Sequence, residues 1–357
     1  MNGDCQPPIP NTSLYENPIV KFTDSDCLLV TGATGLVGSH IAEQAVQRGI
    51  KTRVIVRESS DTSFLKTIDC EIIHGDIADP KSLVSAVDGV TAIVHCAAMV
   101  GDWGPTEPYR QVNVGGTDNL VKAALAAGTL KKFVHVSSLG VYPARDHFGT
   151  DETVQPDPQG IDGYTLTKIE SEQLVLKHVA DSKLPAIVLR PGFIYGTRDR
   201  TVLPRIFEKL ADGKFAFLGS KETLVNNTYV GNLCDAVFIA IVSNEHIGEC
   251  FNITDGRTVT KGEFIQTIAD AGGYKMPTKV VPLPVAKALA KVMEATWKLL
   301  GKKEAPLLSN AKIKFLGLNL DYCIDKAKHK LGYAPATDFT DAMKTTVAWF
   351  KSQDRLP

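Results

Sequence analysis

Two side chains in the segment YTLTK (164–168) have the types and the spacing to exchange a proton. Tyr164 and Lys168 stand four positions apart, so a helix would place both on one face, one turn apart. A free phenol has a pKa of about 10 and is a poor base at neutral pH, but a neighbouring ammonium favours the phenolate. The pair therefore suits alcohol oxidation or ketone reduction, in which the substrate oxygen loses or gains a proton.

A second Tyr-x-x-x-Lys pair, YCIDK (322–326), shows that the spacing alone is weak evidence, because such pairs arise by chance in a chain with nine tyrosines. Position separates the two pairs. Tyr164 follows a predicted strand that ends at Ser138, and open parallel sheets bind ligands beyond the carboxyl ends of their strands. Tyr322 lies in the tail of the chain, where we expect it to be a packing residue.

The segment TGATGLVG (31–38) directly follows one predicted strand and opens a predicted helix. Its glycines let the backbone turn tightly and approach a pyrophosphate, and the free N–H groups of the helix N-terminus favour an anion. Glycine clusters also form empty turns, but the flanking strand and helix favour the binding interpretation. The predicted dinucleotide contacts are Gly32, Thr34, Gly35, Leu36, Val37 and Gly38.

The residue at the end of the second predicted strand bears on the choice between NAD and NADP. Arg57 stands in VIVRESS where an NAD site places an acidic residue for the ribose. A guanidinium suits a 2′-phosphate, whereas a carboxylate repels it, so the sequence favours NADP, with NAD as the alternative. In that alternative Arg57 is a solvated side chain and Glu58 holds the ribose. Asp76 and Ile77 are expected at the adenine, although Asp76 also fits a simple turn.

Short apolar strands alternate with helices between residues 27 and 192, which predicts a parallel sheet covered on both faces. The fold class is therefore α/β, a Rossmann doubly wound parallel sheet with a smaller C-terminal α/β substrate domain. The expected strands are 27–32, 52–57, 70–76, 91–98, 131–138 and 186–192, with later return of the chain at 249–256. Long helices are expected at about 109–127 and 163–180.

The alternation loosens after Pro191, which suggests a division of the chain into three parts. Residues 1–22 carry four prolines and predict a flexible N-terminal arm. Residues 23–190 and about 226–256 are expected to form the cofactor-binding domain, and residues 191–225 and about 257–357 the substrate-binding domain.

Composition excludes several classes of protein. The 357 residues are 44% hydrophobic and 22% charged with a formal net charge of −1, so we expect a globular protein that does not bind nucleic acid. Seven cysteines form no C-x-x-C pair, and eight histidines show no metal-binding spacing, so no disulfide framework and no metal site are expected. Without a signal peptide or an apolar span, the expected location is the cytoplasm.

One stretch, 285–303, is amphipathic and basic and contains Trp297. Such a helix can cover an apolar substrate or touch a membrane surface without crossing it. Packing within its own domain is the alternative that the sequence leaves open.

The motifs together resemble the extended short-chain dehydrogenase/reductase superfamily of the NAD-dependent epimerase/dehydratase type. They occur in the family order: TGATGLVG, HCAA (95–98), NVGGT (113–117), VSSLGVY (136–142), YTLTK and RPGFIYG (190–196). The resemblance covers about residues 26–350. VRESSDTSFL and GDWGP (101–105) look most similar to the 3β-hydroxysteroid dehydrogenase and dihydroflavonol reductase-like branch.

The resemblance implies a role for each matching residue. Ser138 would bond the substrate oxygen, Tyr164 would exchange the proton, and Lys168 would hold the ribose and lower the pKa of the phenol. Asn113 would be a fourth, supporting member, with a helix or turn cap as the alternative, and Ser137 rivals Ser138. Residues expected to line the nicotinamide are Ala97, Ala98, Pro191, Gly192 and Ile194. The family often forms homodimers through the two long helices, so a homodimer is an expectation.

The predicted activity is that of an NAD(P)-dependent oxidoreductase that interconverts a secondary alcohol and a ketone on an apolar small molecule, steroid-like or flavonoid-like. Family members that dehydrate sugars carry an acid after the catalytic hydroxyl residue, whereas Leu139 stands here, so elimination lacks its acid. An NAD-retaining nucleotide-sugar epimerase is the alternative, because it uses the same Ser, Tyr and Lys. A protein that senses redox state for a partner has no use for that set.

Overall fold

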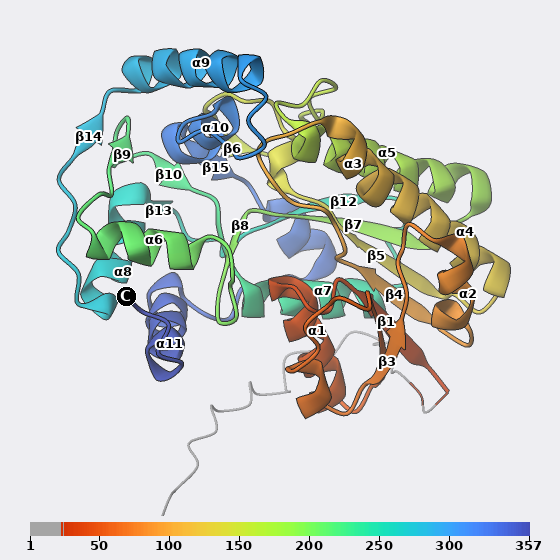
Figure 1. Cartoon of the computed structure of the whole chain (residues 1–357). Coiled ribbons are helices and arrows are strands. Elements are labelled where there is room, and N and C mark those ends of the chain that lie inside the picture. The colour runs from red at the N-terminus through yellow and green to blue at the C-terminus, as the bar shows by residue number, and fades with distance from the viewer. Residues whose placement is uncertain (1–22, 24) are drawn as a thin grey trace, which may run out of the picture.

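Seven parallel strands form the central sheet of the computed structural model, which describes residue 23 and residues 25–357. The predicted arm, 1–22, lies outside the described residues. The strands are β1 (Cys27–Thr31), β2 (Lys51–Val56), β3 (Glu71–His74), β4 (Ala92–His95), β5 (Lys132–Val136), β7 (Ala186–Pro191) and β12 (Cys250–Ile253). Their order, β12-β7-β5-β4-β1-β2-β3, reverses direction at β1, which confirms the predicted α/β Rossmann sheet (Figure 1).

Alternate residues of each strand belong to two different cores, as burial on both faces requires. In β1, Leu28 and Val30 pack with helices α1 (Leu36–Gln47) and α7 (Val230–Val242) on one face. Leu29 packs on the other face with α2 (Pro80–Val87), α4 (Gly116–Ala127) and α5 (Gly163–Ser182). Shorter elements connect the layers: η2 (Leu65–Thr67), α3 (Thr106–Arg110), η3 (Gln111–Gly115), η4 (Leu139–Val141) and β6 (His147–Thr150).

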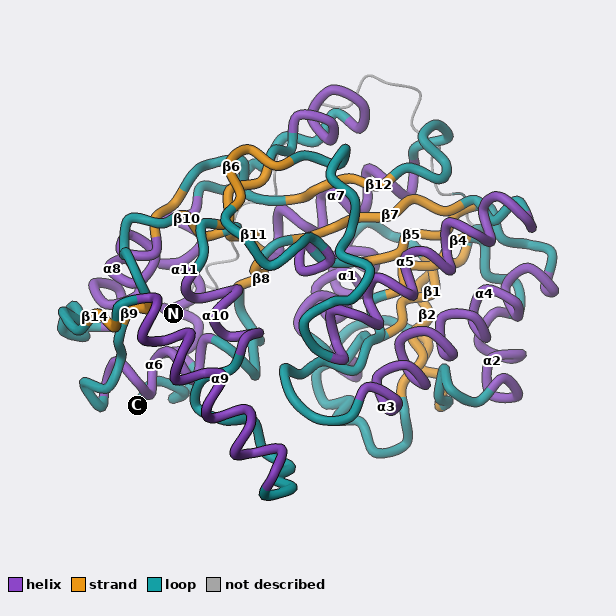
Figure 2. The backbone as a smooth tube through the Cα atoms, turned by 90° about the horizontal axis from the view of Figure 1, so that it is seen from above, coloured by secondary structure: helices purple, strands orange, loops and turns teal. Residues whose placement is uncertain are grey.

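The second half of the chain builds a smaller body beside the sheet (Figures 1 and 2). Its core is aromatic, with Phe207, Phe264 and Phe339 all buried. Its strands are β8 (Phe193–Tyr195), β9 (Phe217–Leu218), β10 (Leu224–Val225), β11 (Asn227–Tyr229), β13 (Val259–Thr260), β14 (Val280–Val281) and β15 (Leu320–Tyr322). Its helices are α6 (Leu203–Ala211), α8 (Lys261–Gly272), α9 (Leu283–Leu299), α10 (Asn310–Gly317) and α11 (Phe339–Ser352). Strands of two or three residues carry too short a pattern to be predicted.

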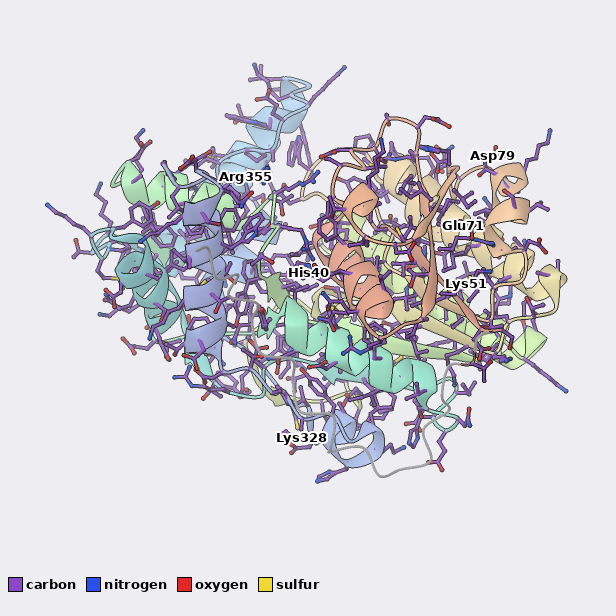
Figure 3. All side chains as sticks on the ribbon, turned by 90° about the horizontal axis from the view of Figure 1, so that it is seen from below. His40, Lys51, Glu71, Asp79, Lys328 and Arg355 are labelled. Atoms are coloured by element: carbon purple, nitrogen blue, oxygen red, sulfur yellow. The ribbon has the colours of Figure 1, made fainter. Side chains whose placement is uncertain are left out.

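The tail of the chain returns to the central sheet. β15 pairs in parallel with β6, and η5 (Ala327–Leu331) packs on the same face of the sheet as α1 and α7. Tyr333 is 1% exposed, and its hydroxyl donates to the carbonyl oxygen of Thr254, just beyond β12. In Figure 3 Lys328 marks this segment below the sheet, while Arg355 marks the end of α11. The division into two domains stays a prediction. Residues 327–333, which that prediction assigns to the substrate-binding domain, pack on the central sheet and cover its apolar face.

Replacing Tyr333 with Ala should lower the free energy of unfolding by about 3–5 kcal/mol, because a large cavity would open under the sheet. Tyr333→Phe keeps the ring and loses one hydrogen bond, so a loss of about 1 kcal/mol is expected. Urea unfolding followed by circular dichroism measures both. Equal losses for the two variants would contradict the packing role.

Candidate active site

Close backbone contacts shape the glycine-rich turn between β1 and α1. Gly32 has a φ of +69°, and a Cβ there would lie 2.8 Å from the nitrogen of Ala97. A Cβ at Gly38 would lie 2.7 Å from the carbonyl carbon of Gly32. Gly35 precedes α1 and has no capping side chain, so the first N–H groups of α1 stay available to an anion. The same turn carries the other predicted contacts, Thr34, Leu36 and Val37.

The end of β4 is held against this turn by Thr31. Its hydroxyl accepts hydrogen bonds from the backbone N–H groups of Cys96 and Ala97, at 3.2 and 3.1 Å, and lies 2.8 Å from Nδ1 of His95. Burial lowers the pKa of His95 to about 3, so the imidazole is neutral. The backbone at Ala97, which together with Ala98 is predicted to line the nicotinamide, is thereby fixed beside Gly32.

The predicted adenosine contacts lie at the ends of β2 and β3. Arg57 and Glu58 follow β2 directly and are exposed. Asp76 forms a turn, because its Oδ1 accepts a hydrogen bond from the N–H of Ala78 over 2.9 Å, and Ile77 is buried behind it. The turn alternative for Asp76 is therefore present in the structure, and it leaves the second carboxylate oxygen without a hydrogen bond to the described residues.

On the nicotinamide side, Pro191 is the last residue of β7. The N–H of Gly192 points back into the fold, 3.1 Å from Oγ1 of Thr228 and 3.2 Å from the carbonyl oxygen of Ile253. Ile194 lies in β8 and packs, partly buried, against the core that α1 and α7 cover. These three predicted residues therefore lie beyond the same carboxyl edge as the glycine turn, and Ile194 also serves the core.

Tyr164 stands in the first turn of α5, which begins with Asp162 as its cap. Asp162 accepts a hydrogen bond from the N–H of Thr165 over 2.7 Å, and the two residues form a capping box. Burial, assisted by the charge of Asp162, raises the pKa of Tyr164 to about 12, and hydrogen bonding with Ser138 opposes that rise. The phenol is thus neutral at neutral pH and has a proton to donate.

Lys168, one turn further along α5, is 5% exposed. Its Nζ donates to the carbonyl oxygen of Val136, the last residue of β5, over 2.6 Å. Burial lowers the pKa of Lys168 to about 8, while Cys96 and Glu172 act in the opposite direction. The ammonium therefore lies at the carboxyl edge of the sheet beside the serine loop. Burial disfavours the charged form of each group, so it raises the pKa of Tyr164 and lowers that of Lys168.

The structure favours Ser138 over Ser137 for the substrate oxygen. Ser137 is 4% exposed, and its hydroxyl is used by Glu172, whose Oε2 it contacts at 2.6 Å. Ser138 is half-buried, and its Oγ accepts a hydrogen bond from the N–H of Gly140 over 3.0 Å, which leaves the hydroxyl proton free for another acceptor.

Asn113 lies within η3 and connects two parts of the site. Its Oδ1 accepts from the N–H of Met99 at 2.6 Å, and its Nδ2 donates to the carbonyl oxygen of Met99 at 3.0 Å and to Oγ1 of Thr167 at 2.9 Å. The alternative of a helix cap is wrong, because the side chain bonds other segments instead of its own helix end. Asn113 joins the loop after β4 to α5, which it contacts at Thr167, the residue before Lys168.

Comparison with known proteins agrees with this geometry. Residues 28–254 match the model of the NAD dependent epimerase/dehydratase family. The chain belongs to this family. It is 31% identical over 346 residues to a 3 beta-hydroxysteroid dehydrogenase/Delta 5-->4-isomerase of Mycobacterium tuberculosis, with 92% of each chain covered. It is 29% identical over 328 residues to a 2-alkyl-3-oxoalkanoate reductase of Stenotrophomonas maltophilia, with 89% of this chain and 97% of the relative covered.

Solved structures show the same architecture. The crystal structure of gox2253 is 32% identical with a TM-score of 0.80 and covers 93% of this chain and 100% of its own. DesIV, a dTDP-glucose 4,6-dehydratase from Streptomyces venezuelae, is 23% identical with a TM-score of 0.74, covers 91% of this chain and 97% of its own, and shares the fold. As a member of the epimerase/dehydratase family, this protein is an enzyme and an NAD(P)-dependent oxidoreductase.

At the position where dehydratases of the family would need an acid, Leu139 is 1% exposed and packs with Val141 and Ile169. An apolar core position offers no proton to a leaving group. Among the described residues, no three His, Cys, Asp or Glu side chains gather as a metal site would require.

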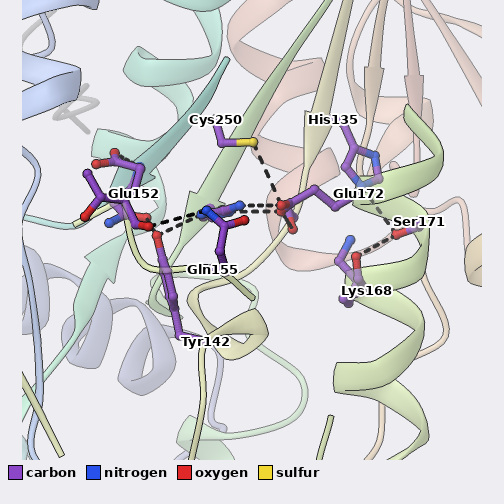
Figure 4. A network of polar contacts seen from close by, with 12 residues as sticks. His135, Tyr142, Glu152, Gln155, Lys168, Ser171, Glu172 and Cys250 are labelled. Atoms are coloured by element: carbon purple, nitrogen blue, oxygen red, sulfur yellow. Dashed lines mark hydrogen bonds and ion pairs between the residues drawn. The ribbon is translucent and has the colours of Figure 1, made fainter. Parts of the chain in front are cut away.

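A buried ion pair behind the site was missed in the sequence. Arg190 in β7 and Glu172 in α5 have side chains 5% and 2% exposed and form a salt bridge (Figure 4). Ser137 donates to the same carboxylate, and Nη1 of Arg190 donates to the hydroxyl of Tyr142 over 2.8 Å. An arginine inside the apolar strand AIVLRP was a signal for such a partner, as was Glu172 one turn beyond Lys168.

Lys314 was also missed, and nothing local indicates it. This residue of α10 is 3% exposed, and its Nζ donates to the carbonyl oxygens of Gly140 and Tyr142, at 2.6 and 2.5 Å. Burial lowers the pKa of Lys314 to about 8. The loop that carries Ser138 is therefore held by a side chain of the smaller body.

The tyrosine of the second Tyr-x-x-x-Lys pair is a core residue that packs behind the serine loop. Tyr322 is 7% exposed, and its ring lies 4.6 Å from that of His147 and 5.4 Å from that of Tyr142 between centroids. Lys326 donates to the carbonyl oxygen of Cys250 over 2.9 Å. The expected packing role of Tyr322 is confirmed.

Replacing Arg190 with Met should lower the free energy of unfolding by about 3–5 kcal/mol, because the buried Glu172 would keep an uncompensated charge. The double variant R190M/E172Q should recover much of that loss. R110M is the matched control, since Arg110 forms an exposed pair with Glu170 on the same helix, and it should change stability little. Chemical denaturation measures all three, and a loss for R190M no larger than that for R110M would contradict a structural role for the buried pair.

Proposed function

We propose that this enzyme is an NADP(H)-dependent reductase of ketones, with the reverse alcohol oxidation, on apolar small molecules. The single observation that carries the proposal is the placement of Tyr164 in the first turn of α5, one turn before Lys168, whose Nζ donates to the carbonyl oxygen of Val136 at the start of the loop that carries Ser138. The nicotinamide supplies or accepts hydride when bound. Tyr164 then gives its proton to the oxygen that gains the negative charge, and Ser138 orients that oxygen.

The charge of the ribose loop supports NADP. Arg57 is exposed directly after β2 and forms no ion pair with another described residue, so its guanidinium is free for a phosphate. Glu58, the alternative ribose ligand, lies 3.5 Å from Nδ1 of His74. A cationic oxidised nicotinamide would stabilise the phenolate of Tyr164, whereas the reduced cofactor leaves the phenol protonated, which suits reduction.

Relatives support an apolar substrate. The printed names of the two relatives above refer to a 3-hydroxysteroid and to a 2-alkyl-3-oxoalkanoate, both carbonyl or hydroxyl compounds with large apolar parts. We therefore propose steroid-like or long-chain keto substrates for this enzyme.

Tyr164→Phe should lower kcat for ketone reduction by about 100-fold or more, because the proton donor is lost while the ring still fills its place. NADPH oxidation with a panel of 3-ketosteroids and 2-alkyl-3-oxoalkanoates measures it, and NADPH binding by fluorescence is the control that should hardly change. Unchanged turnover of a reduced ketone by Y164F would refute the assignment. Isomerisation of a nucleotide sugar with a retained cofactor and no net reduction would instead favour the epimerase.

The exposed face of α9 supports contact with apolar material through 285–303, one of the roles that the sequence leaves open for this stretch. Val285, Leu289 and Val292 are 50%, 46% and 63% exposed, and their spacing puts them on one face, while Figure 2 shows α9 extending away from the body. Nε1 of Trp103 donates to the carbonyl oxygen of Lys302 just beyond this helix, which connects it to the loop after β4. None of the described helices has the length and apolar character to cross a bilayer.

L289S/V292S should reduce co-sedimentation with vesicles that contain anionic lipid, because the apolar stripe and the neighbouring lysines would act together. Val84→Ser is the matched control, since Val84 is 68% exposed on a different helix. Wild-type protein that stays in the supernatant with these vesicles would refute the membrane contact and leave a lid or simple packing.

A further inference from the structure

The segment after β8 crosses from the substrate-binding half to the cofactor-binding half. Oγ1 of Thr197 lies 2.9 Å from Nε2 of His40 in α1, and Nη2 of Arg198 lies 2.7 Å from Oε2 of Glu43. The guanidinium of Arg198 also covers the ring of Phe64, 4.1 Å from its centroid. Arg198 has a φ of +65°, a conformation that a non-glycine residue keeps only where its surroundings impose it.

Two residues further on, Arg200 reaches the loop that follows β2. Its Nη2 lies 3.2 Å from Oδ2 of Asp61. Asp61 comes directly after a tight turn in which the N–H of Ser60 donates to the carbonyl oxygen of Arg57 over 2.9 Å. The carboxylate of Asp61 and the guanidinium of Arg57 therefore belong to one short loop, the ribose loop (57–63).

The charges of the ribose loop pose a problem for a 2′-phosphate. The loop carries one cation, Arg57, and two carboxylates, Glu58 and Asp61. Hydrogen bonds from Ser63, and then the charge of Arg200, lower the pKa of Asp61, so it is ionised at neutral pH. A doubly negative phosphate beside Arg57 would be repelled by both carboxylates unless cations outside the loop offset them.

We propose that Arg200 is a specificity-determining residue for the cofactor: by pairing with Asp61 it offsets the repulsion that this carboxylate would exert on a 2′-phosphate in the ribose loop. The inference rests on the proposed NADP preference and adds a determinant from the other half of the chain. The side chains of the pair are half-exposed, so the pair contributes little to the free energy of unfolding. Its main effect is on the affinity for a charged ligand. NADH, which lacks the phosphate, should not depend on it.

The test compares the dissociation constants of NADPH and NADH, measured by fluorescence titration at low ionic strength. R200Q should weaken NADPH by about three- to tenfold and leave NADH almost unchanged, and added salt should shrink the difference. D61N/R200Q should restore NADPH binding, because the carboxylate that Arg200 offsets is then also removed. R205Q is the matched control, since it removes an exposed arginine of α6 and leaves the pair intact.

Each outcome decides one claim. A larger NADPH-to-NADH ratio of dissociation constants in R200Q, reversed in D61N/R200Q, supports the inference. Three results would overturn it. Equal weakening of both cofactors would mean that Arg200 only holds the two halves together, and unchanged binding of both would mean that it has no role. A loss of NADPH binding that persists in D61N/R200Q would mean that Arg200 binds the phosphate itself. A wild-type enzyme that binds NADH more tightly refutes the NADP preference separately, since the inference is judged by the change in the ratio.

Discussion

The buried pair of Arg190 and Glu172 is the interaction on which the geometry of the site depends. It joins α5, which carries Tyr164 and Lys168, to β7 at the edge where the cofactor is expected. Two charges removed from water are stable only if their remaining hydrogen bonds are also satisfied. Ser137 and Tyr142 meet that demand, and both flank the loop of Ser138. The need to satisfy a buried charge therefore sets the positions of the helix and the serine loop together.

The same exclusion of water gives the reactive groups their protonation states. Burial raises the pKa of Tyr164 to about 12 and lowers that of Lys168 to about 8, because it disfavours the charged form of each group. His95 is neutral for the same reason. In such a site of low polarity, the charge of a bound cofactor would have a large influence on the acidity of the phenol. Under the proposed function, the acidity of Tyr164 would therefore change with the redox state of a nicotinamide bound beside it.

The two halves of the chain share the work of building the site. Lys314 of α10 holds the serine loop, Arg198 holds helix α1, and Arg200 holds the loop that follows β2. Tyr333 and its neighbours cover the sheet in return. A movement of the smaller body would therefore shift the ribose loop, the loop that carries Ser138 and the residues that cover the sheet.

Local sequence determined the sheet, the glycine turn and the tyrosine–lysine pair, because each depends on contacts close in the chain or on a repeating pattern. The alternation of apolar strands and helices predicted the α/β fold, and the glycines at 32 and 38 stand where a side chain would strike the backbone. Tertiary structure decided the rest. It occupied Ser137 with Glu172, turned Asn113 into a bridge between loops, and brought Lys314 and Arg200 to sites far away in sequence. Such long-range pairs leave no periodic trace, because a buried or paired charge selects its partner by position in space and not by distance along the chain.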